Sequence, residues 1–191
     1  MNAATIRVLA SNGWRVVVPD DQTCCGALTA HNGHLATARK LARRNVAAFA
    51  GVDHVVVNAA GCGAHMAGYG DLVAGAELPV RDVMVFLHEE GIRDLAGSLP
   101  ERTVVAYHDA CHALRSQGIH RQPRELLGAI GNLQLAEIPN GDRCCGAAGI
   151  YNVTEPEMSG RLMREKAEAV RRVRKLARKQ AQREGLVAKP K

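Results

Sequence analysis

The chain has 191 residues, enough for one domain or two small ones, and its 47% apolar content can supply a buried core. The aromatic content of 3% argues against a base-stacking surface for single-stranded nucleic acid. The charge is uneven: residues 170–191 carry nine Lys or Arg and one acid, whereas residues 1–169 carry 16 basic and 18 acidic side chains. The net charge of +6 therefore belongs to a basic tail and not to the body of the protein.

The sequence shows neither the pattern of a membrane span nor that of a secretory signal. No apolar run approaches the roughly 18 residues that a membrane span needs, and residues 1–13 lack the layout of a secretory signal. We therefore expect a cytoplasmic protein. The basic tail is most simply a solvated helix, but it could also contact an acidic partner or anionic lipid at the inner face of the membrane. No DNA-reading motif accompanies it, so specific nucleic-acid binding is not expected.

Short apolar runs alternate with helical patterns along the chain. This alternation predicts an α/β fold of short, mostly parallel strands covered by helices. The predicted strands are 14–18, 54–58, 103–107 and 133–138, and the predicted helices are 3–10, 28–50, 80–90, 121–130 and 155–183.

An internal repeat divides the chain. Val18-Pro19 and Ile138-Pro139 are each followed, after four residues, by Cys-Cys-Gly-Ala. A lone cysteine also follows each of two valine pairs, so that each leaves the carboxyl end of a predicted strand, where α/β sheets place ligands. We therefore predict two pseudo-repeated units, 1–78 and 79–169, followed by the tail 170–191.

The six cysteines are the candidate site residues: Cys24, Cys25, Cys62, Cys111, Cys144 and Cys145. Adjacent cysteines bridge to each other only with strain, and no secretory signal favours disulfides. Thiolates are soft ligands, and a vicinal pair suits a multi-iron cluster better than one tetrahedral ion. A glycine after each pair would let the backbone approach such a cluster closely. Buried structural thiols and a zinc site are the alternatives.

Two other patterns give weaker evidence of function. His108 and His112 flank Cys111 at helical spacing, as in a Cys/His nucleophile or a zinc site, but no orienting group or oxyanion hole is marked. Gly61-Cys62-Gly63 mimics a dinucleotide-binding loop, yet Met66 stands where the third glycine belongs. We predict neither a catalytic residue nor a dinucleotide site.

The sequence around the cysteines resembles a known family. The resemblance to the cysteine-rich CCG domain of heterodisulfide reductase, and still more to the iron–sulfur subunit of glycolate oxidase, rests on residues 22–28, 59–63, 107–112 and 143–152. It implies that the six cysteines bind an iron–sulfur cluster of the 4Fe-4S type. It further implies electron transfer alongside a flavin-containing subunit that oxidises a 2-hydroxy acid, with the substrate chemistry left to that partner.

The family's unit has a cysteine before and after its Cys-Cys-Gly, whereas each set here has three members. At the observed spacings the missing cysteines would fall before Met1 and at Gln182, and no C-x-x-C-x-x-C run occurs. We therefore expect a fragment. The alternative functions are a cluster-free docking module and a zinc-binding domain.

Overall fold

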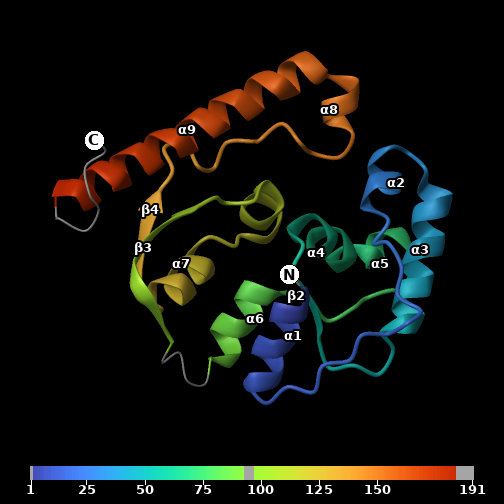
Figure 1. Ribbon diagram of the computed structural model, residues 1–191. Coiled ribbons are helices and arrows are strands. Elements are labelled where there is room, and N and C mark those ends of the chain that lie inside the picture. Colours follow the sequence, from blue (N-terminus) through green and yellow to red (C-terminus); the bar gives the residue numbers. More distant parts are fainter. Residues whose placement is uncertain (1, 93–96, 184–191) are drawn as a thin grey trace. The chain divides into compact units, whose positions relative to one another are not determined.

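The computed structural model describes residues 2–92 and 97–183 (Figure 1). The chain divides into two compact units. The first combines residues 1–95 with 112–123, and the second combines 96–111 with 124–191. The units 1–78 and 79–169 are inferred from the sequence repeat, whereas the two units above are defined by their compactness in space. The repeat-based division therefore stays a prediction.

The first unit is mainly helical. Its helices are α1 (Asn2–Ser11), α2 (Ala27–His31), α3 (Leu35–Ala48), α4 (Ala60–Ala67), α5 (Tyr69–Leu72), α6 (Val83–Glu90) and the π-helical turn η1 (His112–Ser116). Its strands, β1 (Val55–Val57) and β2 (Val80–Asp82), pair in parallel, with Val55 opposite Val80. The core packed beside them consists of Cys25, Ala42, Val55, Met66, Tyr69 and Ala76. One cysteine of the first pair is therefore part of the core.

The second unit holds the longer strand pair. Strand β3 (Ser98–Tyr107) pairs in parallel with β4 (Gly131–Glu137), with a register shift between Ser98 and Thr103. Helix α7 (Arg121–Gly128) lies between them in sequence, α8 (Tyr151–Thr154) is one short turn, and α9 (Pro156–Arg183) packs on both strands. The buried Val173 anchors α9 along its inner face.

The predicted fold class is confirmed: the described strands pair in parallel and helices cover them. Two helix predictions need correction. The helix expected over 28–50 is broken into α2 and α3, because Gly33 takes a left-handed φ of 80° between them. The helix expected over 80–90 begins only at Val83, because residues 80–82 form strand β2.

The strand predicted over 14–18 is wrong. Trp14 packs edge-on against Phe86, with ring centroids 4.9 Å apart, but Val17 and Val18 are more than half exposed. Among the described residues β1 pairs only with β2, so this extended segment has no neighbour to complete a ladder. An apolar run predicts a strand only where a partner strand is in place.

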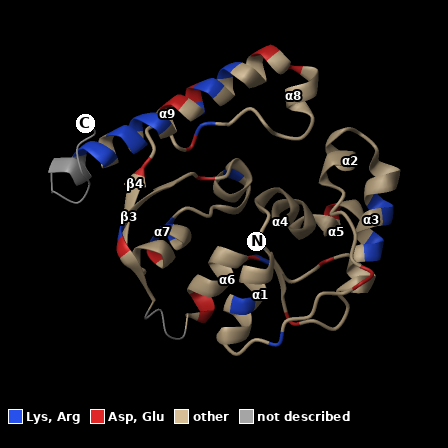
Figure 2. Ribbon diagram, viewed as in Figure 1, with Lys and Arg blue, Asp and Glu red and all other residues tan. Residues whose placement is uncertain are grey.

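The basic residues of the tail are carried by α9, where Figure 2 shows a run of blue. Those with exposed side chains are Arg171, Arg172, Arg174, Lys175, Arg178 and Lys179. No helix in the described part of the chain is long and apolar enough to span a membrane.

Candidate functional site

The first thiol set consists of Cys24, Cys25 and Cys62, all in the first unit. The pair lies in the loop that leads into α2, and Cys62 lies in the first turn of α4, directly after β1. Although 37 positions separate them, the Sγ atoms of Cys25 and Cys62 are 3.2 Å apart. The fold therefore brings the lone cysteine to the pair, as the strand-end rule predicts.

The second thiol set consists of Cys111, Cys144 and Cys145, all in the second unit. Cys111 lies four residues beyond the end of β3, and the pair lies in the loop between β4 and α8. Cys111 lies near both members of the pair, because Cys144 and Cys145 both influence the pKa of its thiol. The two sets thus share one arrangement, a vicinal pair with one distant thiol against it.

The glycine after each pair has the same conformation. Gly26 and Gly146 take φ values of 85° and 81°, in the left-handed region that favours glycine. Each donates its backbone N–H to the first sulfur of its pair, at 3.5 Å to Cys24 Sγ and 3.3 Å to Cys144 Sγ. The sequence repeat is therefore also a structural repeat, and it aims a backbone amide at sulfur in both loops.

Close packing supplies a second reason for glycine at position 146 but not at position 26. A Cβ at Gly26 would meet Ala38 and Leu41 of α3 at 3.5 Å, an ordinary contact. At Gly146 a Cβ would lie 2.6 Å from the backbone oxygen of Ser159 in α9, which no side chain allows. The second loop therefore lies closer to its helix than the first.

Burial governs the ionisation of the thiols. It raises the pKa of Cys25 to about 12; a backbone hydrogen bond from Ala27 opposes this shift, and the neighbouring Cys62 adds to it. Burial is also the main cause that raises the pKa of Cys111, and the neighbouring Cys144 contributes. Both thiols are therefore protonated at neutral pH unless a cation displaces the proton.

The donor chemistry fits a thiolate-bound iron–sulfur cluster. Each set offers three sulfur atoms from two segments of chain, backed by a glycine amide that can hydrogen-bond to sulfur. A single tetrahedral zinc ion would hold thiolates about 3.8 Å apart, from a Zn–S distance of about 2.3 Å. In residues 2–92 and 97–183, no group of three Cys, His, Asp or Glu side chains is placed to hold one ion. The Cys25 and Cys62 sulfurs, 3.2 Å apart, would have to separate to accept either group.

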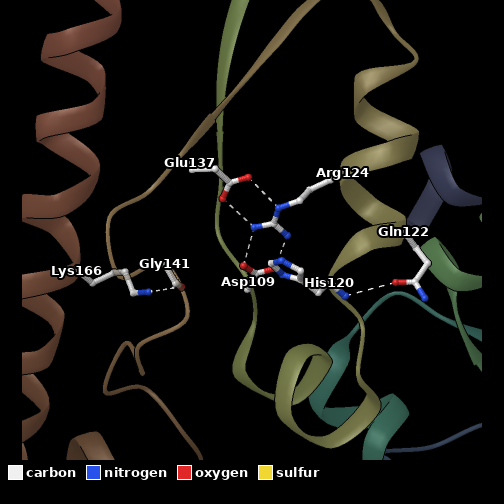
Figure 3. A network of polar contacts seen from close by, with 7 residues as sticks. All are labelled: Asp109, His120, Gln122, Arg124, Glu137, Gly141 and Lys166. Carbon is white, nitrogen blue, oxygen red and sulfur yellow. Dashed lines mark hydrogen bonds and ion pairs between the residues drawn. The ribbon is translucent and has the colours of Figure 1, made fainter.

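An ionic network fixes the end of β3 in the second unit (Figure 3). Arg124 of α7 donates two 2.8 Å hydrogen bonds to the carboxylate of Asp109, two residues before Cys111. It donates two more, of 2.8 and 2.9 Å, to Glu137 at the end of β4, and its guanidinium lies over the Tyr107 ring. Asp109 first and then Glu137 raise the pKa of Arg124, so it remains charged. The network ties three segments together beside the second thiol set.

The flanking histidines lie in different units. His108 belongs to the second unit, its Nε2 is buried with no hydrogen-bond partner, and burial and then Lys166 lower its pKa. His112 belongs to the first unit and lies near Gly61 of α4.

The sequence reasoning missed the side chains that hold the two loops. Asn45 and Tyr69 bond to the backbone of the first loop, and Ser159 and Lys166 bond to the backbone of the second. No shared offset in the sequence marks Asn45 and Lys166, because Asn45 lies 19 residues after Gly26 and Lys166 lies 20 residues after Gly146.

Comparisons with known proteins agree on one family. The family model of the cysteine-rich CCG domain matches residues 1–67 and 105–178. The chain is 36% identical over 182 residues to the probable glycolate oxidase iron-sulfur subunit of Bacillus subtilis, covering 89% of this chain and 41% of that protein. It is 37% identical over 170 residues to a subunit of the fumarate reductase (CoM/CoB) of Methanothermobacter marburgensis, covering 89% of this chain and 34% of that protein.

A third relative is the lactate utilization protein A of Oceanobacillus iheyensis, 29% identical over 177 residues, covering 87% of this chain and 72% of that protein. The chain thus spans less than half the length of the first two relatives and most of the third. No solved structure matches it significantly.

Proposed function

Because the chain belongs to the cysteine-rich CCG domain family, we propose that it carries electrons through an iron–sulfur cluster in a complex that oxidises a 2-hydroxy acid such as glycolate. The observation that supports this function most is the meeting of Cys25 and Cys62, with Sγ atoms 3.2 Å apart. The nearness of Cys111 to Cys144, which contributes to the raised pKa of Cys111, adds to it. The names of the glycolate oxidase, fumarate reductase and lactate utilization relatives support redox work of this class.

All six cysteines would hold the metal: Cys24, Cys25 and Cys62 in the first set, and Cys111, Cys144 and Cys145 in the second. A 4Fe-4S cluster bound at each set would supply reversible one-electron chemistry. Cys25 and Cys111 give up their protons on loading, which the raised pKa of each makes dependent on the metal. The amides of Gly26 and Gly146 supply hydrogen bonds to sulfur, and the buried Cys25 lies on the side of the first loop that is shielded from water. This chain holds no substrate carbon chemistry in the proposal; a flavin-containing subunit takes the hydride.

One observation favours a second function. Each set has three thiols, whereas the unit of the resembling family has more. Cys25 is also a member of the apolar core of the first unit, as a structural thiol would be. A cluster-free module that docks redox subunits together is therefore the second candidate.

We further propose a cytoplasmic location, because six free thiols persist in a reducing compartment. The exposed basic side chains of α9 suit an acidic surface on the partner subunit. Contact with anionic lipid at the inner face of the membrane is the alternative use of the same residues.

Oxygen-free purification followed by iron, sulfide and zinc analysis separates these functions. Matched iron and sulfide with broad visible absorbance support the electron carrier. Zinc without sulfide supports a zinc domain, and neither metal supports the docking module. The variant Lys175→Met, on the exposed face of α9, is the control that should leave the metal content unchanged.

A further inference from the structure

A buried side-chain amide holds the first Cys-Cys-Gly loop through hydrogen bonds. Asn45 of α3 is 1% exposed, and its Oδ1 accepts the backbone N–H of Thr23 at 2.8 Å. Its Nδ2 donates to the carbonyl of Cys24 at 3.2 Å and to the Tyr69 hydroxyl at 3.0 Å. One side chain thus fixes the backbone on both sides of the Thr23–Cys24 step.

Tyr69 completes this grip. Its hydroxyl is fully buried and donates to the carbonyl of Cys25 at 2.7 Å. A buried polar group that loses its partner costs free energy, so the network resists opening. The backbone of residues 23–25 is therefore set by Asn45 and Tyr69 before any metal binds.

A different side chain occupies the matching place in the second loop. Ser159 backs Gly146 as Ala38 backs Gly26, and it also donates to the Gly146 carbonyl at 2.8 Å. Seven residues further along the helix, on the same face, stand Lys166 in α9 and Asn45 in α3. Lys166 donates its Nζ to the carbonyl of Gly141 at 2.7 Å, as Figure 3 shows.

The second loop has the positively charged ammonium group of Lys166 where the first loop has the neutral amide of Asn45. Lys166 and Cys144 line one pocket in the second unit. Four other charges of that pocket are paired, Arg143 with Glu165 at 3.9 Å and Arg172 with Glu168 at 2.9 Å. The hydrogen bond that Lys166 donates goes to a neutral carbonyl, so that contact does not cancel its positive charge, which lines the same pocket as Cys144.

We propose that Asn45 and Lys166 are matched positioning residues, each of which holds one Cys-Cys-Gly loop in place, and that Lys166 in addition makes the surroundings of Cys144 favour negative charge. The inference rests on the proposed function for its purpose, since a nearby cation favours the reduced form of a cluster. Lys166 then raises the reduction potential of a centre at the second thiol set. The first set has Asn45, a neutral side chain, at the matching place.

Hydrogen exchange on the metal-free full chain tests the positioning. We expect Asn45→Leu to speed exchange of the Thr23 amide about tenfold, and Tyr69→Phe to speed exchange in the same loop without removing a side-chain ring. Lys166→Met should speed exchange of the Gly141 and Arg143 amides, and Lys166→Arg should restore protection. The controls Arg43→Met on α3 and Lys175→Met on α9 change exposed side chains and should leave both loops unchanged. Unchanged loop exchange in Asn45→Leu or in Lys166→Met overturns the positioning role of that residue.

Paired alkylating reagents test the charge without any metal. Iodoacetate and iodoacetamide both form an S–CH₂ bond with the Cys144 thiolate and release iodide, but only iodoacetate is an anion. Lys166→Met should lower the iodoacetate-to-iodoacetamide rate ratio at Cys144 several-fold, whereas Lys166→Arg and Lys175→Met keep it. An unchanged ratio overturns the electrostatic role.

The loaded protein gives the last readout. Lys166→Met should lower the reduction potential of the centre at the second thiol set, and Lys166→Arg should leave that potential unchanged. A potential that does not move contradicts the electrostatic role even if the loop loosens. Should the chain bind no iron, the proposed function fails, while the exchange and alkylation results still decide the inference.

Discussion

The burial of the side chains in the Asp109–Arg124–Glu137 network determines how much stability a substitution there should cost. The side chains of Asp109 and Arg124 are 6% and 17% exposed, whereas that of Glu137 is 65% exposed. Replacing Arg124 with Met keeps an aliphatic stem near the Tyr107 ring but leaves the Asp109 carboxylate buried without its guanidinium partner. Removing one partner of a buried pair costs about 3–5 kcal/mol.

The matched substitution is Glu137→Gln. It removes a charge from the same network at a solvated position, where an ion pair contributes at most about 1 kcal/mol. At roughly 2–4 °C per kcal/mol for a chain of this size, Arg124→Met should lower the unfolding midpoint by about 6–20 °C. Glu137→Gln should lower it by no more than about 4 °C.

The assay is thermal unfolding under reducing conditions, read with hydrogen exchange in β3 and β4. Arg124 links β3, α7 and β4 of the second unit. In the Arg124→Met variant, hydrogen exchange should therefore become faster in peptides from β3 and β4. Equal midpoint losses in Arg124→Met and Glu137→Gln would refute the assignment of the buried pair as the stabilising contact.

Two further predictions concern the loops. Metal-free protein treated with diamide should form a Cys25–Cys62 disulfide, with the two thiol hydrogens passed to the reagent, because the sulfurs are 3.2 Å apart; peptide mapping that finds Cys25 joined mainly elsewhere would count against the first thiol set. Gly146→Ala should destabilise the chain by more than about 2 kcal/mol, since its left-handed φ and a 2.6 Å clash add together. Gly33→Ala, with a left-handed φ in open space, should cost only about 1 kcal/mol, and a similar loss in both variants would show that the close approach to α9 is unimportant.

The sequence was sufficient to predict where the thiols meet. Cys62 follows β1 and Cys111 closely follows β3, and parallel strands direct the residues after their carboxyl ends to one edge. The repeated offset from Pro to Cys-Cys-Gly also predicted two loops of one kind, which the matching φ values of Gly26 and Gly146 confirm. These features depend on local order along the chain, and a single sequence displays local order directly.

The supporting side chains could not be predicted in the same way. The role of Asn45 depends on how α3 is rotated against a loop 21 residues earlier, and that of Arg124 depends on two carboxylates from separate strand ends. Such contacts are set by packing between elements, which periodicity does not report. The apolar run 14–18 failed for the converse reason, because its strand-like pattern meets no partner strand among the described residues.

The central claim, that each thiol set binds its own iron–sulfur centre, is tested most directly by the iron and sulfide content of three reconstituted variants and the unaltered chain. Cys62→Ser and Cys111→Ser should each lose about half of the iron and sulfide of the unaltered chain, and the double variant should lose nearly all of it. A double variant that retains the iron and sulfide of the unaltered chain would contradict the claim, and so would an unaltered chain that takes up neither.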